Sequence, residues 1–353
     1  MKRILHIFRT EKFTEEFIYL MRDIPEEDHT FWVFGEAYID ERCTYLKPDN
    51  IKYYPRIEIK MNKKSTENEL QRYDLIIYHG VFEDCIIEYF YLHKELLKKL
   101  ILYFWGGDKE KLPEDKRKRR AKVYVVRKCR AVATIIPQDY TDLKKQYHLK
   151  VKHFCAMYYS AKEIEGISKA VSIPKPCKKS INIQIGNSAT LTNNHFEVLK
   201  NLSRFKEENI NIFIPLSYGN MEYAERVVSY GKEIFGDKFI PVQNFMSLDE
   251  YCRFLYNMDI AIFDMKRQQA LGNILMQMRM GCKIYLNRES LLWDYFTKDL
   301  ECIVSNTADI KKINIKKLVE FTEKDRALNK NQIYKKINKE ESIKAWRKMF
   351  RFL

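Results

Sequence analysis

Residues 181–188, INIQIGNS, decide how the second half of this chain folds. The apolar run predicts a short buried strand, and the glycine at 186 allows the backbone to turn tightly and approach a ligand. Asn187 and Ser188 then offer hydrogen-bonding groups ahead of a predicted helix near residue 194. In open α/β sheets, ligands bind beyond the carboxyl ends of strands, where helix N-termini attract anions. The stretch therefore predicts a parallel sheet with a phosphate site at its edge, the alternative being an ordinary turn.

Strands and helices alternate in both directions from this stretch. Downstream, we expect strands at 211–215, 260–263 and 283–286 and helices at 194–205, 221–235 and 270–280. Upstream, we expect strands at 3–8, 30–34, 75–78, 101–105 and 131–135 and helices at 11–22, 83–98 and 115–128. Ser247 and Glu250 have the spacing of a capping box, and Gly281 has the place of a helix-ending glycine. Such alternation predicts parallel sheets built from βαβ units.

The length of 353 residues fits two α/β domains better than one. We expect a first domain at 1–171, a second at 181–330, and a terminal helix within 331–353 that packs back on the first domain. The segment SIPKPCKKS at 172–180 has two prolines and no periodicity, which predicts a linker. A two-domain dehydrogenase has the same outline, but no GxGxxG follows any predicted strand.

The net charge of +15 predicts an anionic partner. The densest basic cluster is Lys116, Arg117, Lys118, Arg119 and Arg120. It is either a solvated helix face or a contact with anionic lipid headgroups. Neither a signal peptide nor an apolar run long enough to span a bilayer is present, so we expect a cytoplasmic protein that binds a membrane surface. The eight cysteines form no CxxC pair, which predicts reduced core thiols.

Two further polar segments follow predicted strands in the second half. In PLSYG at 215–219, Tyr218 could contact a nucleobase and Ser217 a phosphate or ribose, or the segment is a simple turn. In the loop at 263–273, Arg267, Gln268 and Gln269 stand at a helix entrance. An arginine and a helix dipole there could offset charge that develops on a departing diphosphate.

Two glycine-containing segments follow predicted strands in the first half: HGVF at 79–82 and WGGD at 105–108. His79 and Asp108 are titratable and could deprotonate an acceptor hydroxyl. The alternatives are a hydrogen-bonded core histidine and an aspartate that caps a helix. The chain has no Asp-x-Asp sequence to clamp a metal on a diphosphate, so we expect neither a metal nor another cofactor.

Together these segments resemble glycosyltransferase family 56, the TDP-Fuc4NAc:lipid II Fuc4NAc transferases. The resemblance lies in seven short motifs, in the same order: HGVF at 79–82, WGGD at 105–108, GNS at 186–188, NNH at 193–195, PLSYG at 215–219, RQQALG at 267–272 and NRESLLW at 287–293.

The resemblance implies the GT-B fold, in which two Rossmann-like parallel-sheet domains face a cleft. It implies a TDP-linked 4-acetamido-4,6-dideoxygalactose donor and an undecaprenyl-diphosphate-linked acceptor, used in surface polysaccharide assembly by a peripheral protein at the cytoplasmic face of the inner membrane. Carried over by motif, the donor-binding residues are Gly186, Asn187, Ser188, His195, Ser217, Tyr218, Gln268, Gln269 and Glu289. The catalytic residues are His79, Asp108 and Arg267, and the acceptor-binding residues are Gly80, Trp105, Gly106 and Gly107.

Two other functions compete with this interpretation. One is a GT-B transferase that uses a UDP- or GDP-sugar for another capsule or lipid-linked glycan. The other is a non-catalytic nucleic-acid-binding protein, suggested by the charge and the 23 tyrosines. Because the basic residues gather at 116–130 and in the tail, apart from the glycine motifs, we expect no nucleic-acid partner. Inversion or retention at the sugar is left open.

Overall fold

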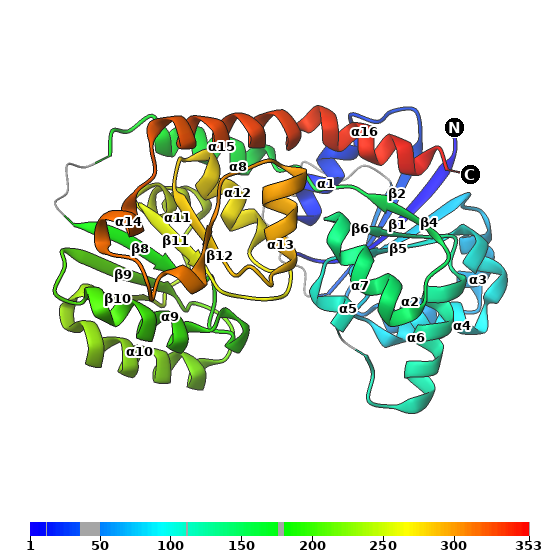
Figure 1. Cartoon of the computed structure of the whole chain (residues 1–353). Coiled ribbons are helices and arrows are strands. Elements are labelled where there is room, and N and C mark those ends of the chain that lie inside the picture. Colours follow the sequence, from blue (N-terminus) through cyan, green and yellow to red (C-terminus); the bar gives the residue numbers. More distant parts are fainter. Residues whose placement is uncertain (12, 36–49, 111, 176–179, 353) are drawn as a thin grey trace. The chain divides into compact units, whose positions relative to one another are not determined.

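A computed structural model describes residues 1–11, 13–35, 50–110, 112–175 and 180–352. The chain forms two compact units: unit 1 is Met1–Ser160 with Lys339–Leu353, and unit 2 is Ala161–Asn338 (Figure 1). Helix α8 (Ala161–Val171), which a boundary at 171 assigns to the first domain, belongs to unit 2. The reason is that Ile167 and Ala170 pack in the same cluster as Cys252 and Met276 of unit 2. Part of the expected linker, 176–179, lies outside the described residues.

In its described residues, unit 1 has a seven-stranded parallel sheet in the order β3-β2-β1-β4-β5-β6-β7. The strands are β1 (Arg3–Arg9), β2 (Asp28–Phe34), β3 (Ile51–Tyr54), β4 (Leu75–His79), β5 (Leu100–Phe104), β6 (Ala131–Thr134) and β7 (Lys152–Cys155). The order reverses between β1 and β4, so their carboxyl ends flank the switch point at which ligands bind in such sheets.

Successive side chains of each strand enter cores on opposite faces of this sheet. On one face, Leu5 and Ile7 pack with the helices α2 (Ile57–Met61), α3 (Ser65–Gln71), α4 (Asp84–Leu92), α6 (Lys116–Lys128) and α7 (Pro137–Tyr147). On the other face, Ile4 and Phe8 pack with α1 (Thr14–Met21) and α16 (Lys339–Phe350). The short elements α5 (Gly107–Glu110) and η2 (Lys94–Lys99) also belong to the described part of unit 1.

The end of the chain returns to unit 1, as expected of a terminal helix. Trp346 and Phe350 of α16 are fully buried in the core that contains α1. The two chain ends lie beside each other in Figure 1, and Lys2 Nζ donates a hydrogen bond to Phe350 O at 3.3 Å. The returning segment begins at 339, because residue 331 lies inside α15 (Glu323–Lys336), a helix of unit 2.

Unit 2 repeats the same topology over its described residues, with strands in the order β10-β9-β8-β11-β12-β13, all parallel. They are β8 (Ile181–Ile185), β9 (Ile210–Pro215), β10 (Phe239–Val242), β11 (Ile260–Phe263), β12 (Lys283–Leu286) and β13 (Ser305–Asn306). Its switch point lies between β8 and β11. The stretch at 181–188 therefore forms one side of this switch point.

Helices cover both faces of the unit 2 sheet (Figure 1). One face carries α9 (His195–Leu202), α10 (Met221–Phe235) and α14 (Ile315–Val319). A second cluster joins α8 to α11 (Leu248–Tyr256) and α12 (Leu271–Arg279). The remaining elements are η3 (Leu191–Asn193), η4 (Ser203–Phe205), η5 (Gly236–Lys238), α13 (Leu291–Asp294), η6 (Tyr295–Asp299) and η7 (Thr307–Asp309).

Several expected elements are confirmed. The strands at 260–263 and 283–286 and the helix at 221–235 have the expected bounds, and the Ser247 capping box is formed. The cysteines that the structure describes form no disulfide: Cys129, Cys252, Cys282 and Cys302 are buried, Cys85 is half-buried and Cys155 is exposed. Cys43 and Cys177 lie outside the described residues. Across the described ranges, no helix is long and apolar enough to cross a bilayer.

Candidate functional site

The loop after β8 is fixed by its own polar side chains. Gly186 has a φ of +63°, and a Cβ there would lie 2.6 Å from His195 Nε2, so only glycine fits. Asn187 N donates to Asn193 Oδ1 at 3.2 Å, and Asn193 Nδ2 donates to Ser188 O at 2.9 Å. The loop is therefore preorganised at the carboxyl end of β8.

Asn187 joins all three polar segments predicted in unit 2. Its Nδ2 donates to Tyr218 OH at 2.8 Å, and its Oδ1 accepts a hydrogen bond from Gln269 Nε2 at 2.9 Å. These side chains follow β8, β9 and β11, which are neighbours in the sheet. The Asn187–Gln269 bond bridges the switch point. Residues that are 82 positions apart in the sequence thus form one polar surface at the sheet edge.

Arg267 is held at the start of α12 by Gln269. Gln269 Oε1 accepts from Arg267 Nε at 3.0 Å and from Thr192 Oγ1 at 2.7 Å. Ala270, between this pair and α12, adopts the left-handed conformation with a φ of +61°. The arrangement places a guanidinium beside a helix N-terminus, where both favour an anion.

Two exposed aromatic rings extend this edge. The side chain of Tyr218 is 46% exposed and that of Phe245, just after β10, is 79% exposed. Their rings stack at an interplanar angle of 27°, with centroids 6.3 Å apart. Exposed stacked rings of this kind suit a planar nucleobase. Sequence reasoning found Tyr218 but missed Phe245, whose only signal is an aromatic residue in the short segment after a strand.

Other predicted donor-binding residues lie beneath the loop or at its margin. His195 is fully buried; its Nδ1 lies 3.1 Å from Tyr223 OH, and burial lowers its pKa to about 4, so it is neutral at pH 7. Ser188 and Gln268 are also buried. Ser217 is half-buried at the end of β9. His195 thus supports the loop from below, because it packs against Gly186 and Tyr223.

Glu289 lies at the outer margin and pairs with a lysine. Its carboxylate is 2.5 Å from Lys266 Nζ, and both side chains are about 70% exposed. The hydrogen bond from Lys266 lowers the pKa of Glu289. Nearby, the Asp264 carboxylate accepts hydrogen bonds from Asn194 Nδ2 at 2.6 Å and from Asn287 Nδ2 at 3.1 Å, which ties the loops after β8, β11 and β12 together.

Two buried glutamines support the β8 loop from inside the unit. Gln184 Nε2 donates to Gly186 O at 2.9 Å, and Gln277 Nε2 of α12 donates to Gln184 Oε1 at 2.8 Å. Both side chains are fully buried. Sequence reasoning missed them, because single glutamines inside apolar segments carry no local pattern.

In unit 1, Asp108 organises the loops after β4 and β5 from inside the protein. It is fully buried, and its carboxylate accepts from Val81 N at 2.8 Å and from Trp105 N at 2.9 Å. Burial raises its pKa, partly offset by these backbone hydrogen bonds. The buried Lys122 Nζ donates to the carbonyl oxygens of Val81 and Asp108. As placed, Asp108 presents no atom to an acceptor hydroxyl and acts as a positioning residue.

His79 is also fully buried, with both ring nitrogens in hydrogen bonds. Its Nε2 lies 3.0 Å from His6 Nδ1, and its Nδ1 lies 2.7 Å from Tyr158 OH. Desolvation holds its pKa well below the ordinary value, so the ring is neutral. A general base needs hydrogen-bond reach to the proton it removes. The structure therefore assigns His79 to the core, the alternative stated above.

The expected acceptor-binding residues surround a half-buried indole. A Cβ on Gly80 would lie 2.7 Å from the Trp105 ring, and Gly80 has a φ of +72°. Trp105 Nε1 donates to Tyr158 OH at 2.9 Å. Gly106 has a φ of +102°, and Gly107 begins α5. These glycines let the β4 and β5 loops pack closely around Trp105.

The basic cluster forms the start of α6. Asp115 caps this helix by accepting from Arg117 N and Lys118 N, both at 2.9 Å. A hollow of about 460 Å³ runs along the exposed face of α6 and is lined by Lys116, Arg119, Arg120, Val123, Tyr124, Arg127 and Lys128. Apolar Val123 and Tyr124 thus lie between two groups of basic side chains.

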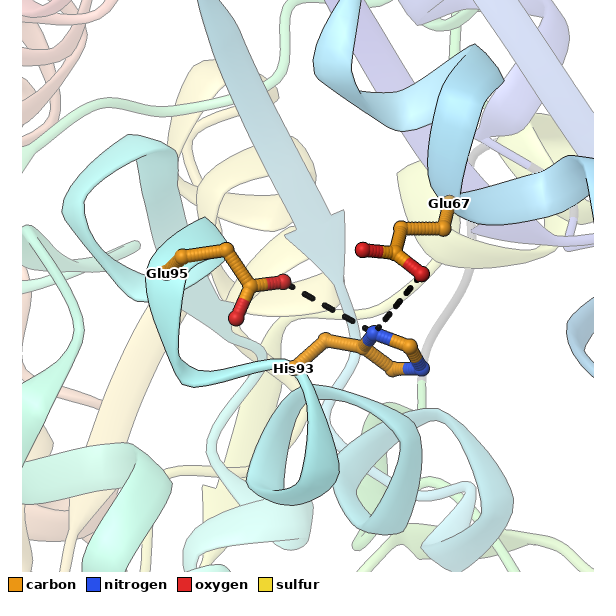
Figure 2. A group of neighbouring side chains, drawn as sticks. All are labelled: Glu67, His93 and Glu95. Carbon is orange, nitrogen blue, oxygen red and sulfur yellow. Dashed lines mark ion pairs between the residues drawn. The ribbon is translucent and has the colours of Figure 1, made fainter.

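One group in the described residues has the composition of a cation site, and Figure 2 shows it. His93 Nδ1 lies 3.6 Å from Glu67 and 3.7 Å from Glu95, and the two glutamates are exposed. Glu67 lies in α3, before β4, and the other two lie between α4 and β5. The group is therefore at the amino edge of the unit 1 sheet, opposite the loops described above, and we assign it no role there.

Comparison with known proteins gives a family and a fold. The profile of the family described as "4-alpha-L-fucosyltransferase glycosyl transferase group 56" matches residues 10–350. Among solved structures, a glycosyltransferase from Rickettsia africae is 12% identical, with a TM-score of 0.70 over 99% of this chain and 98% of that one. Anabaena HepE, in complex with UDP and glucose, is 9% identical, with a TM-score of 0.68 over 100% of both chains. The fold class is GT-B, with two parallel-sheet α/β units.

Proposed function

Because the chain belongs to glycosyltransferase family 56, we propose that it transfers 4-acetamido-4,6-dideoxygalactose from a TDP-sugar to an undecaprenyl-diphosphate-linked oligosaccharide, in the assembly of a surface polysaccharide. Glycosyltransferase activity follows from the family itself. Three features of this function are proposals that derive from the sequence motifs. They are the donor sugar, the lipid-linked acceptor, and the location at the cytoplasmic face of the inner membrane.

The observation that carries the donor assignment is the Asn187 junction. It gathers three motifs at the switch point of unit 2, with the Tyr218–Phe245 rings on one side and Arg267 on the other. We propose that the rings hold the base and that Arg267 with the start of α12 holds the diphosphate. As bonds to the departing diphosphate break, Arg267 stabilises the growing negative charge. We propose that no metal is required, because the chain lacks an Asp-x-Asp sequence.

A thermal-shift panel of TDP, UDP, GDP and NAD, with EDTA or Mn²⁺, tests this proposal. A nucleotide at 100 times its Kd adds about 2.7 kcal/mol to the free energy of unfolding. We expect the largest shift with TDP and no effect of EDTA. A larger shift with UDP or GDP would favour a transferase with another nucleotide-sugar. Equal shifts with all four nucleotides, or a strict need for Mn²⁺, would contradict the proposal.

The α6 hollow supports a peripheral contact with acidic lipid. Basic side chains near a membrane contribute about 1 kcal/mol each, and the apolar Val123 and Tyr124 can enter the interface. Changing Lys116, Arg117, Arg119 and Arg120 to glutamine should release the protein from phosphatidylglycerol vesicles and leave TDP affinity unchanged. The matched control changes four exposed lysines of unit 2 to glutamine: Lys311, Lys312, Lys316 and Lys324. Equal loss of vesicle binding in both variants would show that the cluster contributes only to the general positive charge of the protein.

A further inference from the structure

A second cavity opens at the carboxyl edge of the unit 1 sheet. Its volume is about 460 Å³, within the range of small-molecule sites. Its described lining comes from the last residue of β1, the end of β2, the segment after β3 with the start of α2, and the loop after β4. The described residues that matter for its chemistry are Arg9, Pro55, Arg56, Ile59, Asn62 and Glu83.

The lining of this cavity suits a sugar ring. Pro55 and Ile59 are exposed and supply apolar surface, on which the C–H face of a pyranose can lie. Arg9, Asn62 and Glu83 supply donors and acceptors for hydroxyl groups. His79 and Asp108, by contrast, are enclosed in the protein.

Glu83 has the two properties that a general base needs, a fixed position and an accessible oxygen. Arg9 Nη1 donates to Glu83 Oε1 at 2.9 Å, and Glu83 N donates to Tyr78 OH at 2.9 Å. The Glu83 side chain is 24% exposed. Across the described ranges of the chain, its Oε2 makes no hydrogen bond, which leaves that oxygen available to a ligand in the cavity.

The position of this pair in unit 1 matches that of the donor junction in unit 2. Arg9 ends β1 and Glu83 follows β4, so their ion pair bridges the point where the strand order reverses. The Asn187–Gln269 bond bridges the corresponding point between β8 and β11. Such points are where ligands bind in open α/β sheets.

We propose that Glu83 is the general base of the transfer reaction and that the cavity beside it holds the acceptor sugar; this rests on the proposed function. The acceptor hydroxyl gives its proton to Glu83 Oε2 while its oxygen forms a bond to the anomeric carbon of the donor. The bond from that carbon to the diphosphate breaks, and its electron pair leaves with the nucleoside diphosphate. Attack from the side opposite the leaving group inverts the anomeric configuration.

The test compares wild type with Glu83→Gln in single-turnover transfer to an undecaprenyl-diphosphate-linked disaccharide. The donor is TDP-4-acetamido-4,6-dideoxygalactose, or the UDP- or GDP-sugar if the nucleotide panel selects it. Loss of a general base costs about 10²- to 10⁴-fold in rate. We expect such a loss for Glu83→Gln, with TDP affinity within about twofold of wild type. NMR of the wild-type product should show an inverted anomeric centre.

Two variants separate Glu83 from its surroundings. Glu67→Gln removes an exposed carboxylate at the opposite edge of unit 1 and should transfer at the wild-type rate. Glu58→Gln removes the second carboxylate of the cavity's described lining. The proposal is overturned if Glu83→Gln retains near wild-type rate in a variant that melts normally, if the loss follows Glu58→Gln instead, or if configuration is retained. A wild-type protein that binds nucleotide and transfers no sugar contradicts the proposed function, and the role of Glu83 falls with it.

Discussion

Both units end their strands in polar loops, but the two edges use them differently. In unit 2, Asn187, Tyr218 and Gln269 bond to one another at the surface, and Tyr218 is 46% exposed. In unit 1, His79 ends β4 and Asp108 lies in the segment after β5, yet both are 0% exposed. Polar residues at strand ends thus build a surface in one unit and an interior in the other.

The difference teaches that the segments covering a strand end decide whether a polar residue meets solvent. Tyr158 and Trp105 cover His79, and the buried Lys122 reaches over Asp108. In unit 2, the comparable residues His195 and Gln184 lie on the inner side of the loop after β8. They support this loop and leave its outer side open. Changes at His79 and Asp108 should therefore lower the stability of unit 1, whereas changes at the exposed edge of unit 2 should lower catalysis.

The largest expected contrast between the units is in acid. Burial lowers the pKa of His29 to about 4 and holds the pKa values of His6 and His79 well below 6.5. In the unfolded chain these three histidines therefore bind more protons than in the folded one. Their contribution to the free energy of unfolding is fully present above pH 6.5 and is lost as the pH falls below that value. Each of these histidines should lower the free energy of unfolding by on the order of 1 kcal/mol at about pH 5.5. Unit 2 has one comparable group, His195.

Hydrogen exchange of the full chain, compared at neutral and mildly acid pH after correction for intrinsic rates, measures this contrast. Amides of β1 and β4 should lose protection before those of β8 and β11. The change His29→Gln, which cannot gain a proton, should reduce the acid sensitivity of unit 1. Equal loss of protection in both units would show that His6, His29 and His79 do not control acid stability.

The second prediction tests whether Asp108 supports the fold. Asp108→Ala leaves the buried N–H groups of Val81 and Trp105 without partners, and each such group costs about 1–3 kcal/mol. We expect the free energy of unfolding to fall by about 2–4 kcal/mol and TDP affinity to stay unchanged. Asp84→Ala is the control, because its surface pair with Lys118 contributes little. A variant of normal stability that fails to transfer sugar would restore Asp108 as the base.

The third prediction concerns Arg267 on the exposed edge of unit 2. If it stabilises the leaving diphosphate in the transition state, Arg267→Ala should lower kcat about 10²-fold, or about 2.7 kcal/mol, with a smaller change in donor KM. Lysine should rescue only in part, since a point charge cannot replace a guanidinium fork. Melting temperature and single-turnover rate are measured together. A folded variant with a normal rate would show that Arg267 has a local structural role, to which its bond to Gln269 belongs.

Central strands could be predicted from the sequence, and edge strands could not. β11 (Ile260–Phe263) and β12 (Lys283–Leu286) are buried; β11 is a continuous apolar run, and β12 is apolar after Lys283. At the edge of unit 1, β3 (Ile51–Tyr54) contains exposed Lys52 and Tyr53, and its pattern carries no such signal. Strand position in the sheet therefore decides how visible a strand is in the sequence.

The site was predictable where several polar residues are consecutive. The segments at 186–188, 215–219 and 267–272 predicted one edge, and the structure brings them together. The burial of His79 depends on Tyr158, 79 positions away, and no local pattern reports that contact. Phe245 and Gln277 are single residues of common type, so only the folded chain shows what they touch.

The smallest expected effect compares backbone strain in the two units. Ala270 and His148 both adopt the left-handed conformation, with φ values of +61° and +51°. A side chain costs about 1–2 kcal/mol there, and glycine relieves it at the expense of a more disordered unfolded chain. Ala270→Gly and His148→Gly should therefore each raise the free energy of unfolding by about 0.5–1 kcal/mol.

The two variants should differ in donor affinity. His148 is an exposed helix-ending residue of unit 1, so its change affects stability alone. Ala270 lies between Gln269 and α12, and a freer backbone there loosens the hold of Gln269 on both Asn187 and Arg267. We expect TDP to bind a few-fold more weakly to Ala270→Gly, measured by calorimetry beside His148→Gly. Unchanged affinity in both would mean that the switch-point junction keeps its geometry without the strained residue, because its hydrogen bonds alone suffice.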